Sequence, residues 1–163
     1  MTRSGRQPER KPGKRHSILD RMLDIDYVVD ANVLISMLIS GNSSYQRIAE
    51  VRHFSTSAFA LVEIKKYQNI IFQKSRLNKG EVRRYGYLLF SKITVCPEFI
   101  IEPSIHSKAE GLVANIDTKD VDYLALAIQL GQVLLTRDKP LYSGLRREGF
   151  RQIMMFDEFL SGV

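Results

Sequence analysis

The sequence predicts an α/β domain in which helices cover both faces of a parallel sheet of about five strands. Two observations support this fold class. From Asp26 onward, short apolar segments alternate with amphipathic helical segments, and the short segments lack the alternation of half-exposed strands. Strands that are apolar on both faces are typical of a buried parallel sheet. A chain of 163 residues is long enough for one such domain.

Each element has its own signal. The predicted strands are Tyr27–Val29, a segment near Phe54–Thr56, the segment "EFIIEP" closed by Pro103, Val133–Thr136 and Gln152–Met154. The predicted helices follow Asp30, cover Tyr45–Val51, follow Ser57 as N-cap, begin near Lys79, and cover Ser104–Ile116, Thr118–Leu130 and Pro140–Glu148. In the helix that begins near Lys79, the spacing puts Val82, Tyr85, Leu88 and Leu89 on one face.

The net charge of +6 belongs to the N-terminal segment and not to the predicted domain. Residues 1–21 hold seven Lys or Arg against two acids, a net of +5, whereas residues 22–163 hold 17 basic and 16 acidic groups, a net of +1. We expect residues 1–21 to be a disordered basic tail and residues 22–163 to form one domain. Two interpretations of the tail stay open: an arm that attracts nucleic acid, or leader sequence from a misplaced start before Met22.

Composition excludes several classes of protein. The sequence has no apolar run of about 18 residues, so it predicts no spanning helix, and its basic start is not followed by an apolar stretch as in a secretory signal. The single cysteine, Cys96, fits a reducing cytoplasm. His16, His53 and His106 are scattered, without the close spacing of a zinc motif.

Four acids are predicted at or near one edge of the sheet. Asp30 directly follows the first strand, and Asp138 follows "VLLTR" in the same relation to the fourth strand. Asp120 lies in the first turn of the helix that leads to the fourth strand, and Glu63 lies about two turns into the helix after the second strand. Ligands of open parallel sheets bind outside the carboxyl ends of the strands, so these acids are candidate ligand-binding groups.

Helical phase separates the aspartates of "DTKDVDYLALAIQLG". Asp120, Leu124 and Ile128 are spaced four apart and share a face that points to the core. Asp122 is rotated by about 200° from Asp120, so we expect it to face water. Asp117 lies one turn before Asp120 and is a candidate second acid on its side.

Each of these acids has a structural alternative, because aspartate caps helices and favours their first turn. Asp30 and Asp138 are candidate caps, Asp120 fits a first turn that Thr118 caps, and Glu63 can pair with Lys66 or Tyr67. Four acids at one edge without a matching internal cluster of Lys or Arg favour a hard divalent cation. Two such ions can stabilise the attacking and leaving oxygens of a phosphodiester displacement.

The sequence resembles the PIN-domain nucleases. The resemblance rests on "VVDANVLIS" with Asp30 and Asn32, Glu63 in "ALVEIKKY", Asp117 and Asp120 in "DTKDVDYLALAIQLG", and Asp138 in "LLTRDKPL". The four acids occur in the order that the family shows. The match runs from Asp26 to the C-terminus and leaves out the tail, and residues 69–104 are its least constrained part.

The resemblance implies a three-layer α/β/α sandwich with a ribonuclease site that depends on Mg²⁺ or Mn²⁺. It implies that Asp30, Glu63, Asp120 and Asp138 hold the metal directly or through water, with Asp117 as an auxiliary acid, and that Asn32 and Thr136 support them. It further implies attack of an activated water on phosphorus, leaving a 3′-hydroxyl and a 5′-phosphate. Many small PIN proteins are toxins of the virulence-associated protein C type, usually dimeric and silenced by an antitoxin, so these are expected partners besides RNA.

Basic and aromatic side chains near the acids suggest an RNA track. Lys65 and Lys66 neighbour Glu63, and Arg137 and Lys139 flank Asp138, so all four basic groups can neutralise phosphates. A solvated helix face explains Lys65 and Lys66 equally well. Tyr123 is a candidate for base stacking, although its spacing is more typical of a core residue. The segment Val82–Phe90 is either an ordinary amphipathic helix or a surface for a second copy or an antitoxin.

Three other functions compete with a nuclease. A haloacid-dehalogenase-type phosphatase needs a second Asp two residues after the first, where this chain has Asn32. A receiver domain needs an Asp at the end of the third strand, where "EFIIEPS" offers only Glu102. The third is a PIN fold without turnover that binds nucleic acid or acts as a scaffold. The complete acid set argues against this third function, because loss of an acid is the usual way for such folds to become inactive.

Overall fold

The computed structural model describes residues 26–116 and 121–163. The predicted basic tail and the two acids Asp117 and Asp120 lie outside the described residues, and so do the first positions of the helix predicted from Thr118. The predictions made for them therefore stay predictions.

The described residues form a five-stranded sheet in the order β3-β2-β1-β4-β5, in which every neighbouring pair is parallel. The strands are β1 (Tyr27–Val29), β2 (Phe54–Ser57), β3 (Ile93–Cys96), β4 (Val133–Thr136) and β5 (Ile153–Met155). The central strand β1 pairs Val28 with Ser55 on one side and with Leu134 on the other. The predicted parallel α/β sheet is confirmed.

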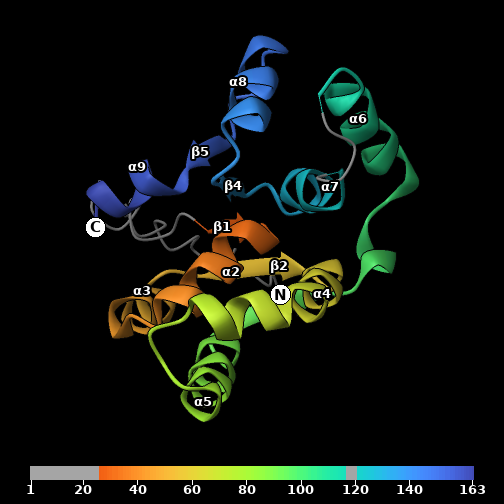
Figure 1. The fold of residues 1–163 in the computed structure, drawn as a ribbon. Coiled ribbons are helices and arrows are strands. Elements are labelled where there is room, and N and C mark those ends of the chain that lie inside the picture. The colour runs from red at the N-terminus through yellow and green to blue at the C-terminus, as the bar shows by residue number, and fades with distance from the viewer. Residues whose placement is uncertain (1–25, 117–120) are drawn as a thin grey trace, which may run out of the picture.

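Helices cover both faces of this sheet. They are α2 (Ala31–Ser40), α3 (Ser43–Val51), α4 (Phe59–Lys74), α5 (Lys79–Phe90), α6 (Pro103–Val113), α7 (Val121–Leu130), α8 (Lys139–Arg147) and the short α9 (Phe156–Ser161). Figure 1 shows α2 to α5 on one side of the strands and α6 to α8 on the other. The right-handed crossovers usual in parallel sheets account for this division, because the chain moves from β1 through β2 to β3 at one edge and then through β4 to β5 at the other. The result is the predicted three-layer α/β/α sandwich.

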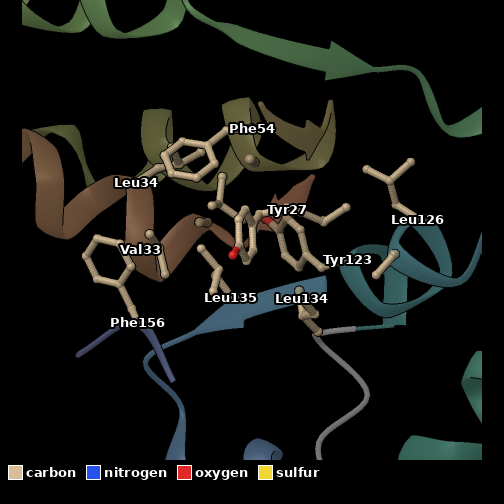
Figure 2. Close-up of a cluster of buried hydrophobic side chains, with 14 of the residues drawn as sticks. Tyr27, Val33, Leu34, Phe54, Tyr123, Leu126, Leu134, Leu135 and Phe156 are labelled. Carbon is tan, nitrogen blue, oxygen red and sulfur yellow. The ribbon is translucent and has the colours of Figure 1, made fainter. Parts of the chain in front are cut away.

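The core forms around β1, whose three residues are all buried. Figure 2 shows Tyr27 of β1 among side chains from β2, β4 and α7, including Phe54, Leu134 and Tyr123. The Tyr27 ring contacts Phe159 edge to face, with 4.9 Å between ring centroids. Val28 and Val29 have no exposed surface, so the sheet is closely packed where β1 ends and Asp30 follows.

The third strand was predicted in the wrong place. β3 is Ile93–Cys96, which pairs residue for residue with all of β2, and Glu98–Ile100 is instead a 3₁₀ turn, η1. Phe99 is 86% exposed, so this segment buries too little apolar surface to form a strand of the sheet. The segment "ITVC" is rich in β-branched and apolar residues, whereas the prediction places the strand in "EFIIEP".

Smaller differences concern helix ends and faces. Val82, Tyr85 and Leu89 are buried as predicted, whereas Leu88 is 41% exposed and lies off the buried face of α5. The N-cap of α4 is Ala58 and not Ser57, although the Ser57 hydroxyl accepts a hydrogen bond from the Phe59 amide. The remaining predicted elements end within a few residues of the observed ones, and α9 was not predicted. Within residues 26–116 and 121–163, no helix is both long and apolar enough to cross a membrane.

Candidate active site

The candidate site lies where the strand order reverses, at the carboxyl ends of β1 and β4. These strands are neighbours, and Val29 pairs with Leu135, so Asp30 and Thr136 follow at the same edge of the sheet. The Asp30 amide also reaches the Leu135 carbonyl at 3.4 Å. Such a switch point opens a crevice between the helices that leave the two strands on opposite faces.

Asp30 is a buried carboxylate with two defined partners. Its side chain is 1% exposed. Oδ1 accepts a hydrogen bond from the Val33 amide at 2.9 Å, which makes Asp30 the N-cap of α2, and Oδ2 accepts one from Thr136 Oγ1 at 2.6 Å. The capping and functional interpretations of Asp30 are therefore compatible, since each oxygen keeps a free lone pair.

Three acids interact at this edge. Burial raises the pKa of Asp30 to about 6, although the hydrogen bonds from Thr136 and Val33 oppose the shift, and the nearby charges of Glu63 and Asp138 raise it further. Glu63 of α4 and Asp138 after β4 are thus each close enough to Asp30 to disfavour its ionised form. A compensating positive charge beside Asp30 would therefore favour its ionised form.

Asp138 is both a cap and a neighbour of Thr136. Its Oδ1 accepts from the Leu141 amide at 2.9 Å as N-cap of α8, and its own amide donates to Thr136 Oγ1 at 3.0 Å. The buried Thr136 hydroxyl therefore donates to Asp30 while it accepts from Asp138. This arrangement links the Asp30 carboxylate to the backbone of Asp138 through one hydroxyl.

Glu63 contacts Tyr123, and the sequence did not predict this contact. The Tyr123 hydroxyl of α7 donates to Glu63 Oε2 at 2.5 Å, and the Tyr123 ring packs on Phe59. The tyrosine is 1% exposed, so stacking on an RNA base is unsupported, whereas the predicted core position is correct. Burial, the hydrogen bond to Glu63 and the charges of Glu63 and Asp30 raise the Tyr123 pKa, so the phenol stays a donor. A tyrosine in an aliphatic run needs a partner for its hydroxyl, so the sequence signals that Tyr123 has a polar partner but not that the partner is Glu63.

The structure describes some of the other predicted site residues and not others. Lys65, Lys66, Arg137 and Lys139 are exposed. Asn32 is exposed in the first turn of α2, and no hydrogen bond joins its side chain to the described acids. Asp117 and Asp120 lie outside the described residues.

The prediction of which α7 residues face the core is largely confirmed. Leu124 is fully buried and Ile128 is packed against the core. Asp122, expected to face water, is only 24% exposed and lies 3.6 Å from His106 of α6. That prediction is therefore wrong in part, because α6 covers this face of α7.

The comparisons with known proteins agree with this geometry. The profile of the PIN domain family matches residues 28–156, which is most of the chain. The chain belongs to the PIN domain family. PIN domains are generally nucleases.

Solved structures show the same fold at low sequence identity. PAE2754 from Pyrobaculum aerophilum is 16% identical with a TM-score of 0.60, and the match covers 84% of this PIN domain protein and 88% of that chain. VapBC2 from Rickettsia felis, bound to a DNA fragment from its promoter, is 11% identical with a TM-score of 0.54, over 80% and 97% of the two chains. A search of curated proteins finds no match.

The donor set of this PIN domain fits a hard divalent cation in chemistry, since carboxylate oxygens are its preferred ligands and Glu63 and Asp138 lie near enough to buried Asp30 to add to the rise of its pKa. Among the described residues, however, three ligand atoms come within 4.8 Å of one another only at Glu98, His106 and Asp122. Asp30, Glu63 and Asp138 therefore do not by themselves enclose an ion. Water, or a further acid from residues 117–120, is needed to complete the coordination.

Proposed function

We propose that this PIN domain is an endoribonuclease that depends on Mg²⁺ or Mn²⁺. The observation that carries the proposal is the presence of Asp30, Glu63 and Asp138 near the switch point, where burial raises the pKa of Asp30 and the charges of Glu63 and Asp138 add to that rise. A structural cap needs no such neighbours, because capping uses one oxygen of one acid. Asp120 and Asp117 complete the proposed ligand set.

In the proposed mechanism, the residues of this chain position the reaction. A bound divalent cation would supply charge neutralisation at the scissile phosphate and an activated water. Thr136 holds Asp30 in place by its hydrogen bond, and Tyr123 holds Glu63 in the same way. The exposed Lys65 and Arg137, together with Lys66 and Lys139, are proposed to neutralise backbone phosphates of single-stranded or structured RNA. The products expected are a 3′-hydroxyl and a 5′-phosphate.

The test is cleavage of a labelled single-stranded RNA by wild type, Asp30→Asn and the matched surface control Asp157→Asn. Asp157 is exposed in the first turn of α9, so its loss leaves the candidate site intact. We expect wild type and Asp157→Asn to cleave with Mg²⁺ or Mn²⁺ and not with EDTA, and Asp30→Asn to be inactive. Deletion of residues 1–21 should leave the cleavage unchanged.

Two other outcomes contradict the nuclease proposal. Equal cleavage by wild type and Asp30→Asn would show that a contaminating ribonuclease is the source. Binding of RNA by wild type without metal-dependent cleavage of any RNA in a transcriptome-wide digest would favour the alternative function, a PIN module that binds nucleic acid or acts as a scaffold.

A second candidate function is that of the toxin in a toxin–antitoxin pair. It is favoured by the structural similarity to the Rickettsia felis VapBC2 complex and by apolar side chains exposed on α4 and α5, including Val62 and Tyr87. Such a surface suits a partner protein, either an antitoxin or a second copy. Expression in a bacterial cytoplasm, the proposed location, should then arrest growth with wild type and not with Asp30→Asn. Normal growth with both, at equal protein levels, would contradict the toxin proposal and leave the nuclease proposal standing.

A further inference from the structure

A second cluster of metal-ligating side chains lies on the outer side of α7. Glu98 of η1, His106 of α6 and Asp122 of α7 each offer a ligand atom, and these atoms all lie within 4.8 Å of one another. The three residues come from separate elements and are at least eight positions apart in the sequence. For that reason the sequence shows no zinc motif here, although the fold brings together an imidazole and two carboxylates.

His106 has a carboxylate near each of its two ring nitrogens. Its Nε2 lies 3.6 Å from Asp122 Oδ1, and its Nδ1 lies 3.3 Å from Glu110 Oε1, one turn further along α6. A separation of 3.6 Å is too long for a good hydrogen bond. It matches the spacing of adjacent ligand atoms around a tetrahedral zinc ion, about 3.3–3.6 Å for bonds of 2.0–2.2 Å. A histidine that binds metal through one nitrogen usually has a carboxylate beside its other nitrogen, and Glu110 is such a neighbour of His106.

The elements that carry these ligands are fixed to one another. The Glu102 amide at the start of α6 donates to Gln129 Oε1 of α7 at 2.9 Å. Ala109 and Val113 of α6 are fully buried. His106 and Asp122 therefore sit on two packed helices rather than on loops, which reduces the cost of ordering them around an ion.

We propose that Glu98, His106 and Asp122 bind a zinc-class divalent cation, with Glu110 orienting the His106 ring. Imidazole is a ligand for Zn²⁺ and its neighbours in the first transition row, whereas Mg²⁺ takes oxygen ligands and suits the sheet-edge acids instead. Three protein ligands leave a coordination position for water, in keeping with the exposure of Glu98.

This site is separate from the candidate active site. The side chain of Tyr123 points from α7 to Glu63, whereas that of its neighbour Asp122 points to His106 of α6. An ion bound by Glu98, His106 and Asp122 would hold η1 and α6 onto the first turn of α7. The proposal does not depend on the nuclease proposal, because it uses none of the sheet-edge acids.

Exposed ion pairs are the simpler explanation, and they contribute little to stability. The two explanations differ in what they predict for zinc. An ion pair shows no preference for Zn²⁺ over Mg²⁺, whereas the proposed site binds Zn²⁺ in excess Mg²⁺ and becomes more resistant to heat when it does.

The experiment is a calorimetric titration of the untagged full-length protein with Zn²⁺ in excess Mg²⁺, followed by thermal denaturation with and without Zn²⁺. The variants are His106→Ala, Asp30→Asn and the matched control His53→Ala, which replaces an exposed histidine far from His106 in the sequence. We expect wild type, His53→Ala and Asp30→Asn to bind one Zn²⁺ ion and to gain thermal stability. His106→Ala should bind it at least about 10-fold more weakly and lose the gain.

Three results would overturn the proposal. Absence of Zn²⁺ binding by wild type would leave only exposed ion pairs. Equal binding by wild type and His106→Ala would place the ion elsewhere. Loss of binding in Asp30→Asn, checked to be folded by circular dichroism, would place it at the sheet-edge acids. None of these results bears on RNA cleavage in Mg²⁺, so failure here and failure of the nuclease proposal are distinguishable.

Discussion

Replacement of Asp30 by asparagine should stabilise the metal-free protein at neutral pH and should abolish the proposed RNA cleavage. Burial raises the pKa of Asp30 from 3.8 to about 6, against the hydrogen bonds from Thr136 and Val33. At pH 7.5 the folded chain therefore holds a carboxylate where ionisation is disfavoured, whereas the unfolded chain leaves it in water. At about 1.36 kcal/mol for each pKa unit, the rise corresponds to a cost of about 3 kcal/mol.

The sign follows from the direction of the shift. A group whose pKa is raised on folding stabilises the fold fully below pH 3.8, and the contribution is lost as the pH rises through about 6. Asparagine removes the ionisation but not the polarity of the site. Its oxygen can accept from the Val33 amide, while its NH₂ group needs the Thr136 hydroxyl to accept instead of donate. We therefore expect a gain in the free energy of unfolding of about 1–3 kcal/mol at pH 7.5.

The assay is urea denaturation followed by circular dichroism at pH 7.5 and pH 5.0, in EDTA and with Mn²⁺. In EDTA the advantage of Asp30→Asn over wild type should shrink at pH 5.0, where the wild-type carboxyl is mostly protonated. Binding of Mn²⁺ should raise the free energy of unfolding of the wild type by mass action, by about 2.7 kcal/mol at a Mn²⁺ concentration 100 times the dissociation constant. The rise for the variant should be smaller. The control Asp157→Asn, at an exposed position, should follow wild type in every condition.

The refuting result is clear-cut. If Asp30→Asn is less stable than wild type in EDTA at pH 7.5, the two hydrogen bonds stabilise the ionised Asp30 by more than burial destabilises it. Asp30 is then primarily a structural cap. A stability difference that does not change between pH 5.0 and pH 7.5 would show that Asp30 does not titrate in this range.

Two further predictions concern other positions. Tyr123→Phe removes the hydroxyl that holds Glu63, so the Mn²⁺ affinity measured by calorimetry should fall about 10-fold with the fold intact; unchanged affinity would show that the contact does not position Glu63. Gly41 has φ 60° at the end of α2, and a Cβ there would lie 2.5 Å from a Leu77 methyl carbon, whereas Gly111 in α6 has no atom within 4 Å of its Cβ position. Gly41→Ala should therefore lower the free energy of unfolding by about 1–2 kcal/mol, and Gly111→Ala should raise it by about 0.5–1 kcal/mol. Urea denaturation measures both. A Gly41→Ala variant more stable than Gly111→Ala would contradict the structure at α2.

The sheet-edge acids were predictable because local signals determine them. A strand that is apolar on both faces and ends in an acid places that acid at the carboxyl edge of a parallel sheet, as for Asp30 and Asp138. The family resemblance rests on the same short segments. The third strand could not be placed this way, because β3 is identified by its pairing with β2 and not by a stronger local pattern than "EFIIEP".

Contacts between helices were decided only by the tertiary structure. Nothing within α4 or α7 alone indicates that Tyr123 donates to Glu63, since the two residues are 60 positions apart. The same holds for His106 and Asp122, which the sequence treats as a scattered histidine and a surface acid, and which the packing of α6 on α7 brings to 3.6 Å. The sequence by itself determined that Asp30 and Asp138 follow the ends of β1 and β4, because that depends on short-range hydrophobic patterning. Which side chains meet across elements depends on long-range packing, and only the folded chain brings those atoms together.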